Sequence, residues 1–357
     1  MYRHSGIGRY LQSLLPLVLP ALDAEHVRVV TYPSLLEGAA WTSDPRVEVH
    51  EERSPIYSIA EQTMTWRGVF DDTDLLWVPH YNAPLWSRCR TVLTIHDIAP
   101  VAVPEILRSL LKRRFANLLI RRAVGQATEL LAVSEFTASE LCARLGVARS
   151  RITVTHPGLD GSWFDRSPAH SEEDGVPYLL FVGNVKPNKN LGLLLEAFSR
   201  VMDALPYRLL AVGRISGFGT GDEGALQKAG VLGDRVRFTG EVSEEALRSL
   251  YAGASALCVP SLYEGFGFPL LEAMAKGCPV LCSTAGSLPE IAGDAALQFD
   301  PHDAASLAAC LMRVREVASM DRLRAAGDLR VHRFSLGSCA EKTAVVINRL
   351  LGSGNVG

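Results

Sequence analysis

Short apolar runs and longer segments with helical periodicity alternate along most of the chain. The runs are dominated by Val, Leu and Ile, a composition typical of parallel strands that are buried on both faces. Between them, apolar residues recur at helical spacing, most clearly over residues 191–205. This alternation predicts an α/β fold with parallel sheets. We predict strands at residues 26–32, 74–79, 90–97, 129–134, 178–184, 208–214, 235–240, 256–260 and 280–283.

The pattern divides the chain into two domains. Ser, Pro, Glu, Asp and Gly cluster between residues 162 and 176, which is typical of a linker. We therefore predict a first domain over residues 1–165, a linker over 166–176 and a second domain over 177–334. A last helix follows, within residues 335–357.

Two acids, Glu264 and Glu272, stand at the ends of a turn that contains two glycines, two aromatic residues and a proline. The turn precedes a helix over residues 269–276, which Pro269 begins and Gly277 ends. The N–H groups of a glycine loop at a helix start can seat an anion such as a diphosphate. Glu272, one turn into the helix, is placed to contact a hydroxyl pair such as a ribose. The plainer interpretation is that Glu264 is a solvated loop carboxylate and that Glu272 only complements the helix dipole.

Two positions in the first domain are further candidates for a ligand site. Gly6 and Gly8 precede a helical pattern, so their N–H groups could meet a ligand, although a simple glycine turn is the plainer interpretation. His96 and Asp97 come at the carboxyl end of a predicted strand, where doubly wound sheets bind ligands. Equally, His96 could be a near-core histidine and Asp97 a cap of the next turn.

Lys189 is the corresponding candidate in the second domain. It directly precedes Asn190, which we predict to be the N-cap of the helix that begins at residue 191. A cation at this end opposes the helix dipole and therefore favours a bound anion as a third partner. A solvated surface lysine is the alternative.

Residues 104–122 are basic and rich in leucine and isoleucine. Such a segment is most often a solvated helix face, but a basic, leucine-rich helix can also lie on an anionic bilayer. Both interpretations stay open. The apolar stretch over residues 11–22 is broken by Pro16 and is too short to span a bilayer, so we expect a soluble, cytoplasmic protein.

Composition narrows the class of protein. Of 357 residues, 48% are hydrophobic and 21% charged, and the formal net charge is -3, which indicates a globular protein and does not favour nucleic acid binding. Seven scattered cysteines without regular spacing argue against a disulfide framework. Cys278 and Cys282 flank a strand-like run and lack a second pair, so we predict buried thiols and no metal site.

The stretch EGFGFPLLEAMAKGCPV, Glu264 to Val280, resembles the E-x7-E signature of the retaining glycosyltransferases of family 4. The resemblance covers nearly the whole chain. It implies the GT-B fold, in which two Rossmann-like doubly wound domains face a central cleft. The first domain would bind the acceptor, the second would bind a nucleotide-sugar, and residues 335–357 would cross back to the first. Members of the family usually open with an apolar strand before the glycine turn at Gly6, and that strand is missing here; a start site assigned too late is the explanation we favour.

The resemblance also assigns roles. His96 would lie beside the transferred sugar and Glu264 would hold its hydroxyls, and these two are the predicted catalytic residues. Lys189 would neutralise the donor diphosphate, but the arginine that accompanies it in the family is Asn184 here, which leaves Lys186 or Arg214 to compensate. The predicted donor-binding residues are Gly6, Gly8, Asn184, Lys189, Arg214, Val242, Glu264, Gly265, Phe266, Gly267, Phe268 and Glu272.

The implied reaction retains anomeric configuration by an ion-pair, front-face route in which the departing phosphate takes the acceptor's proton. It requires no metal and no cofactor beyond the nucleotide-sugar. The motifs GIGRY, His-Asp and GNVKPNKNL most resemble bacterial mannosyltransferases, so the expected transfer is of mannose from GDP-mannose to a saccharide or lipid-linked saccharide in cell-surface polysaccharide synthesis. Peripheral contact with an anionic membrane accompanies this expectation. A nucleotide-sugar epimerase and a non-catalytic nucleotide-sugar binding protein are the alternatives.

Overall fold

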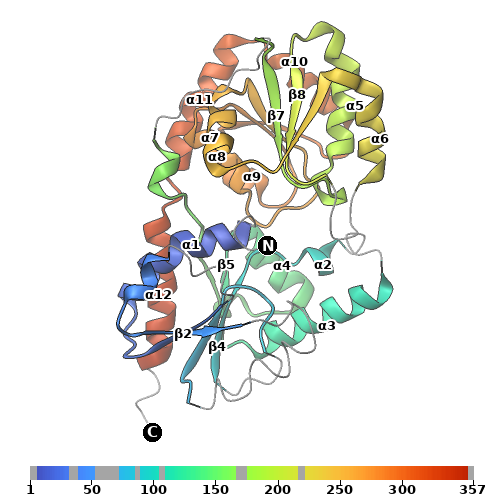
Figure 1. Cartoon of the computed structure of the whole chain (residues 1–357). Coiled ribbons are helices and arrows are strands. Elements are labelled where there is room, and N and C mark those ends of the chain that lie inside the picture. The colour runs from blue at the N-terminus through green and yellow to red at the C-terminus, as the bar shows by residue number, and fades with distance from the viewer. Residues whose placement is uncertain are drawn as a thin grey trace. The chain divides into compact units, whose positions relative to one another are not determined.

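The computed structural model describes residues 6–31, 39–52, 72–84, 89–103, 109–165, 175–215 and 222–352. They divide into two compact units (Figure 1). Unit 1 draws on Met1–Val101, Leu111–Gly158 and Ser335–Gly357, and unit 2 on Ala102–Leu110 and Leu159–Phe334.

A six-stranded sheet forms the centre of unit 2. All of its pairings are parallel, in the order β12-β11-β10-β7-β8-β9. The strand order reverses between β7 and β10, which makes their carboxyl ends the topological switch point of a doubly wound sheet. The strands are β7 (Tyr178–Val182), β8 (Arg208–Val212), β9 (Val236–Gly240), β10 (Ala256–Val259), β11 (Val280–Ser283) and β12 (Ala296–Phe299).

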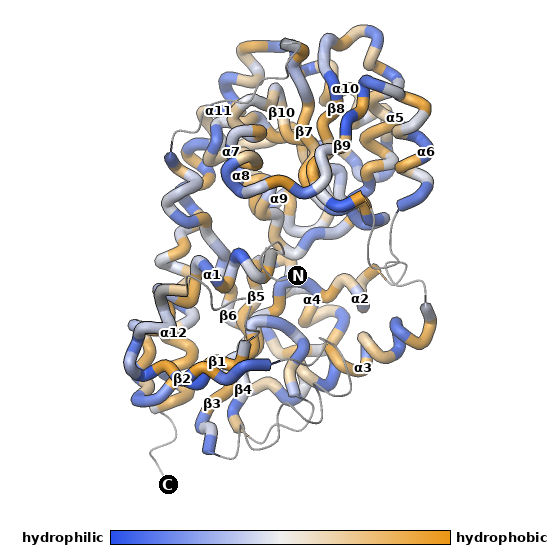
Figure 2. Tube along the Cα trace, viewed as in Figure 1, coloured by the Kyte–Doolittle hydropathy of each residue, from blue (hydrophilic) through white to orange (hydrophobic). Residues whose placement is uncertain are grey.

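Helices cover both faces of this sheet. In Figure 1, α5 and α6 lie to one side of the strands, and α7, α8 and α11 to the other. Leu194, Leu195 and Phe198 of α5 are fully buried, as the predicted apolar stripe requires. Figure 2 shows hydrophobic residues gathered along β7 and β8. The helices are α5 (Leu191–Val201), α6 (Glu223–Leu232), α7 (Glu244–Gly253), α8 (Phe268–Ala275), α9 (Leu288–Ala292), α10 (Ala304–Arg313) and α11 (Val317–Val331).

Unit 1 contains two parallel sheets. One pairs β1 with β2, and the other has the order β3-β4-β5-β6. The final helix, α12, packs against α1 and also contacts β3. The strands are β1 (Val27–Thr31), β2 (Val47–Glu51), β3 (Leu75–Val78), β4 (Arg90–Ile95), β5 (Glu129–Ala132) and β6 (Ile152–Val154). The helices are α1 (Gly6–Val18), α2 (Ala99–Ala102), α3 (Leu110–Gln126), α4 (Glu135–Leu145) and α12 (Leu336–Gly352).

The two sheets of unit 1 differ from the single doubly wound sheet that the sequence predicts. Within the described ranges, β1 pairs with β2 alone and β3 with β4 alone. Arg28 of β1 nevertheless reaches Asp72, shortly before β3, with 3.2 Å between its Nη1 and the Asp72 Oδ1. The starts of β1 and β3 are therefore held within the span of one arginine side chain.

The first boundary between the units also differs from the predicted one. Residues 159–165 belong to unit 2, because Trp163 anchors them there. Its side chain is buried, its ring centroid lies 6.0 Å from that of Tyr251, and the Arg248 guanidinium lies over the indole at 5.9 Å. One aromatic anchor in a polar segment leaves no periodic signal in the sequence. Most of the predicted linker, residues 166–174, lies outside the described part of the chain.

Candidate active site

The loops that follow β7 and β10 meet at the switch point of unit 2. Lys189 ends a short 3-10 turn, Pro187–Lys189, in the first loop, and Glu264 lies in the second. Lys189 Nζ donates to Glu264 Oε1 at 2.5 Å, and the two side chains are only 22% and 15% exposed. The structure thus joins two residues that the sequence had singled out separately.

Serine side chains fix Glu264 and its loop. Ser261 Oγ donates to Glu264 Oε1 at 2.7 Å, so this oxygen accepts two hydrogen bonds. Ser287 Oγ donates to the carbonyl oxygens of Glu264 and Phe266, at 3.0 and 2.7 Å, and the Ser287 N–H also donates to the Glu264 carbonyl oxygen at 3.1 Å. Neither serine was predicted as a site residue, since isolated serines carry no pattern. Each satisfies polar groups that the loop would otherwise bury unpaired.

Gly286 lets the next loop approach Glu264 closely. Its φ is 63°, and a Cβ there would lie 2.6 Å from the Glu264 carbonyl oxygen and 2.8 Å from the Glu264 nitrogen. Gly277 has a similar φ of 66°, but nothing lies within 4 Å of its Cβ position. A side chain at either position would therefore have an unfavourable backbone conformation, but only one at residue 286 would also clash with Glu264.

This pair gives a matched test of whether the position of Glu264 matters. Gly277→Ala should lose about 1–2 kcal/mol of stability in urea unfolding, because a side chain disfavours left-handed backbone, and Gly286→Ala should lose at least as much, because its Cβ would also clash with the Glu264 backbone. Gly286→Ala alone should also lose at least about tenfold in kcat/KM for sugar transfer, since it displaces the carboxylate. Equal activity of the two variants would contradict a role for the Glu264 position.

The glycine turn after Glu264 leads into α8 as predicted. Gly267 has a φ of 110° at the N-cap position, and no side chain caps the helix. Phe266 is buried, with its ring centroid 5.2 Å from that of Phe268 and 5.8 Å from that of Phe334. The start of α8 thus keeps N–H groups without a side-chain cap beside Gly265 and Glu264, which suits an anion.

Asn190 corrects one prediction. It occupies the N-cap position of α5 but makes no capping hydrogen bond, and its φ is 56°. Its Nδ2 donates instead to the carbonyl oxygens of Pro260 and Pro301, at 3.0 and 2.8 Å. Asn190 therefore ties the loop after β7 to the loop after β10, which helps to hold Lys189 beside Glu264.

Asn184, Arg214 and Val242 lie along the neighbouring strand ends. The Arg214 N–H donates to Asn184 Oδ1 at 3.1 Å, so Asn184 joins the loops after β7 and β8. Arg214 Nε lies 2.7 Å from Glu241 Oε1, and Val242 follows, half-buried. The charge of Arg214 is thus paired with a carboxylate, and its role as the compensating cation remains a prediction.

Glu272 lies away from solvent. The side chain is 1% exposed, and its Oε2 accepts a hydrogen bond from the Tyr251 hydroxyl at 2.8 Å. Tyr251, on α7, had not been identified from the sequence. Because the carboxylate is buried in this structure, its predicted contact with a ribose stays a prediction.

Two histidines lie at the carboxyl edge of the larger sheet in unit 1. His96 follows β4, and its Nε2 lies 3.1 Å from the Pro79 carbonyl oxygen. A carbonyl only accepts hydrogen bonds, so Nε2 carries the hydrogen and Nδ1 has the lone pair in the neutral ring. The Tyr10 ring stands edge-on to the imidazole, with 4.8 Å between centroids. His80, which the sequence had not singled out, follows β3.

Burial keeps both imidazoles neutral. It lowers the pKa of His96 to about 4, and burial together with the neighbouring His96 lowers the pKa of His80 to about 3. Asp97 caps α2, because its Oδ1 accepts from the Ala99 N–H at 2.8 Å. The plainer interpretation of Asp97 is therefore confirmed.

These lowered pKa values predict an acid-sensitive stability. Between about pH 4 and 6.5 the unfolded chain binds protons at His80 and His96 that the folded chain does not, so the free energy of unfolding should rise with pH in this window. The loss on acidification should be at most about 3 kcal/mol for His96, because one pKa unit corresponds to about 1.4 kcal/mol and partial exposure screens the effect. Urea unfolding at several pH values measures it. The His80→Asn/His96→Asn variant should show a flatter dependence, and an unchanged slope would contradict the assignment.

Gly6 and Gly8 lie in the first turn of α1, so the glycine turn predicted before the helix is already helical there. The N–H groups of a first helical turn have no partner within the helix. The contact of Gly6 and Gly8 with phosphate stays a prediction.

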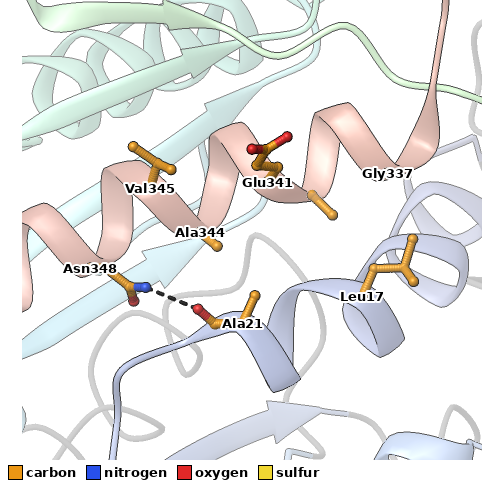
Figure 3. A pocket seen from close by; sticks show the side chains of 8 residues that line it. Leu17, Ala21, Gly337, Glu341, Ala344, Val345 and Asn348 are labelled. Carbon is orange, nitrogen blue, oxygen red and sulfur yellow. Dashed lines mark hydrogen bonds between the residues drawn. The ribbon is translucent and has the colours of Figure 1, made fainter.

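A cavity of about 360 Å³ lies elsewhere in unit 1, between α1 and α12. Figure 3 shows Leu17 and Ala21 on one side and Glu341, Ala344, Val345 and Asn348 of α12 on the other. Asn348 Nδ2 donates to the Ala21 carbonyl oxygen at 2.9 Å. The cavity lies near the end of α1 that is opposite to Gly6, where α12 has small side chains such as Ala340 and Ala344. It is a gap in helix packing, and none of the predicted site residues lines it.

All seven cysteines are free thiols, as predicted. Burial raises the pKa of both Cys278 and Cys282 to about 12, which fits small buried apolar groups. The described ranges contain no group of three or more His, Cys, Asp or Glu side chains that could hold a metal ion. Among the helices that the structure describes, none is long and apolar enough to cross a membrane.

Comparison with known proteins identifies relatives of both units. The family model described as Glycosyltransferase Family 4 matches residues 9–163, and the one described as Glycosyl transferases group 1 matches residues 176–316. The chain is 28% identical to O-antigen chain mannosyltransferase B of Escherichia coli, over 96% of this chain and 95% of that protein. It is 31% identical to the MMP alpha-(1->4)-mannosyltransferase of Mycolicibacterium hassiacum, over 80% and 72%.

Solved structures share the fold. WaaG, a glycosyltransferase involved in lipopolysaccharide biosynthesis, superposes with a TM-score of 0.71 at 18% identity, over 96% of each chain. Anabaena HepE, solved in complex with UDP and glucose, superposes with a TM-score of 0.70 at 19% identity, over 98% of this chain and 95% of that chain. Both structures support the predicted GT-B architecture.

Proposed function

Because the chain belongs to glycosyltransferase family 4 and is a transferase, we propose that it moves mannose from GDP-mannose to a saccharide or lipid-linked saccharide with retention of configuration. The names of two relatives support the choice of sugar. One is the E. coli O-antigen chain mannosyltransferase, which matches almost end to end. The other is the O-antigen chain mannosyltransferase RfbU of Salmonella typhimurium, 29% identical over 81% of this chain and 77% of that protein.

The ion pair between Lys189 and Glu264 is the observation that carries the mechanism. An ammonium group has three donors, and one of them is used on Glu264, so two can turn to the oxygens of a leaving diphosphate. The charge that develops on the phosphate in the transition state is then stabilised by a preorganised cation, and α8 adds N–H groups at the same edge. Glu264, held by Ser261, is left to accept hydrogen bonds from sugar hydroxyls.

Metal independence follows from the same proposal. Lys189 and the start of α8 supply positive potential where a divalent ion would otherwise act. Transfer should therefore persist after treatment of the enzyme with EDTA. Loss of transfer that Mg²⁺ or Mn²⁺ restores would contradict this part of the proposal.

Glu272 would hold the donor ribose together with Tyr251. A carboxylate oxygen has more than one lone pair, so it can keep the Tyr251 hydrogen bond and still accept from a ribose hydroxyl once the nucleotide reaches it. Glu272→Gln should accordingly raise the donor Kd more than it lowers kcat.

The deciding experiment uses GDP-mannose labelled in the sugar, with and without a mannose-containing lipid-linked acceptor. Labelled acceptor supports the proposal, and its anomeric configuration, read by NMR, checks retention. A changed sugar on the nucleotide without acceptor identifies an epimerase, and tight binding without turnover identifies a binding protein. Thermal-shift measurements with UDP-, ADP- and dTDP-sugars test the choice of nucleotide.

A further inference from the structure

The Phe334 side chain packs on the glycine turn that follows Glu264. Its ring centroid lies 5.8 Å from that of Phe266, with an interplanar angle of 81°, and the Phe266 ring in turn stands edge-on to that of Phe268. Phe334 and Phe266 are only 8% and 5% exposed. Edge-on aromatic pairs are favourable beyond the area that they bury. A residue distant in sequence therefore covers one side of the turn.

This aromatic contact is separate from the main hydrophobic core of unit 2. That core gathers buried residues of α5, α10 and the sheet, among them Phe198 and Phe299. Among the described residues that form it, neither Phe266 nor Phe334 is included. Phe334 is also the last residue of unit 2, since Ser335 belongs to unit 1. The burial of Phe334 is thus explained by the glycine turn rather than by the central core.

Arg330 of α11 holds Phe334 and α9 together. Its guanidinium lies over the Phe334 ring, with 5.2 Å between Cζ and the ring centroid. Its Nε donates to the Ile291 carbonyl oxygen at 2.9 Å, and its Nη2 donates to the Glu290 carbonyl oxygen. Both carbonyl groups belong to the last turn of α9, where a cation also complements the helix dipole. One side chain thus fixes an aromatic ring and a helix end at once.

Helix α9 connects Arg330 to the turn by a second route. The helix begins directly after Ser287, whose Oγ donates to the carbonyl oxygens of Glu264 and Phe266. Arg330 therefore reaches the turn both through the Phe334 ring and through α9. Because the turn is fixed at the Phe266 ring and at two carbonyl groups, its backbone cannot rotate freely and the Glu264 carboxylate keeps its place.

We propose that Phe334 and Arg330 are positioning residues of the donor site, which hold the glycine turn so that Glu264 meets the transferred sugar. The inference rests on the proposed function, because that function assigns to Glu264 the contact with the sugar. A group that is fixed before the ligand arrives avoids the cost of being ordered on binding. A role in packing alone would instead predict a loss of stability and no effect on the turn or on transfer.

The position of the turn can be tested without any ligand. The Ser287 N–H donates to the Glu264 carbonyl oxygen, so its hydrogen exchange, followed by mass spectrometry, reports on the turn. Phe334→Leu removes the ring beside Phe266, and Arg330→Met removes both hydrogen bonds to α9. Each variant should accelerate exchange in the peptide that contains Ser287 at least about tenfold, because local opening becomes easier.

Phe198→Leu is the matched control. Phe198 is fully buried, and the Arg235 Cζ lies 5.7 Å from its ring centroid, so it has the same kind of neighbour as Phe334 but lies in the main core. It should lower the thermal unfolding temperature at least as much as Phe334→Leu does. Exchange in the Ser287 peptide should nevertheless stay within about twofold of the unchanged chain, because this opening is local.

Kinetics then connect the turn to the sugar. On folded protein, kcat/KM for mannose transfer should fall at least about tenfold in Phe334→Leu and in Arg330→Met and stay within about twofold in Phe198→Leu. Phe266→Leu/Phe334→Leu should lose little more than Phe334→Leu alone, because both changes act through one contact.

Two outcomes would overturn the proposal. The first is exchange of the Ser287 peptide that neither Phe334→Leu nor Arg330→Met changes. The second is faster exchange with kcat/KM unchanged, since the turn would then be held without consequence for the sugar. If the unchanged chain transferred no mannose while exchange still responded to both variants, the proposed function would fail and the positioning of the turn by Phe334 and Arg330 would stand.

Discussion

Lys189→Ala should lower kcat/KM for sugar transfer by at least about a hundredfold, the effect expected when one preorganised donor is removed from a developing negative charge. The Lys189 side chain is mostly buried, and its Nζ lies 2.5 Å from Glu264 Oε1. Both kcat and the donor Kd should worsen, since the diphosphate is charged before and after the sugar departs. Initial-rate kinetics and calorimetric titration of the donor measure the two effects.

Lys228→Ala is the matched control. Lys228 also lies in unit 2 and pairs with a glutamate, Glu196, but both side chains are about half exposed. Its removal should leave kcat/KM within about twofold, as exposed ion pairs contribute little. A Lys189→Ala variant that matched this control would contradict the assignment of the diphosphate site.

The Glu264→Gln variant tests whether the pair acts as one unit. Because the two side chains share a hydrogen bond, their effects on kcat/KM should not add, and the double variant should lose less than the product of the single losses. Additive losses would mean that the two residues serve separate parts of the donor.

The strands of unit 2 could be predicted from the sequence because most are buried on both faces. Runs such as residues 178–182 and 256–259 contain few polar residues, and their limits differ from those predicted by one or two residues. The strands β2, β6 and β12 were missed. Each lies at an edge of its sheet, and each contains polar residues beside its few apolar ones, so none forms a long apolar run.

The sequence was sufficient to identify several residues of the candidate site, but it did not predict which of them contact one another. The sequence picked out Lys189 and Glu264, yet they are 75 residues apart, and only the order of β7 and β10 in the sheet brings them together. Asn190 was predicted to cap α5 from its local position, whereas its partners, Pro260 and Pro301, are distant in sequence. Tertiary hydrogen bonds outweighed local preference at this residue.

His96→Asn should lower kcat about a hundredfold, the contribution typical of one positioned catalytic histidine, while the donor Kd stays within about twofold. His96 belongs to unit 1, whereas Lys189, Glu264 and Glu272 belong to unit 2, so the proposed nucleotide contacts remain intact. The hydrogen bond to Pro79 fixes Nε2 as the donor, and burial keeps the ring neutral, so Nδ1 has a lone pair that, in the proposed role, would face a sugar that gains positive charge. His302→Asn, at an exposed position, is the control and should leave both constants unchanged.

A second variant separates catalysis by His96 from a packing role. Tyr10→Phe keeps the ring that stands edge-on to the imidazole, so kcat should be nearly unchanged, whereas Tyr10→Leu removes the aromatic contact and should lower kcat without weakening donor binding. If His96→Asn lost donor affinity and kcat in equal measure, or lost neither, the histidine would not act on the transferred sugar. A selective loss of kcat in His96→Asn and Tyr10→Leu is the result that links the buried aromatic packing of unit 1 to the transfer step.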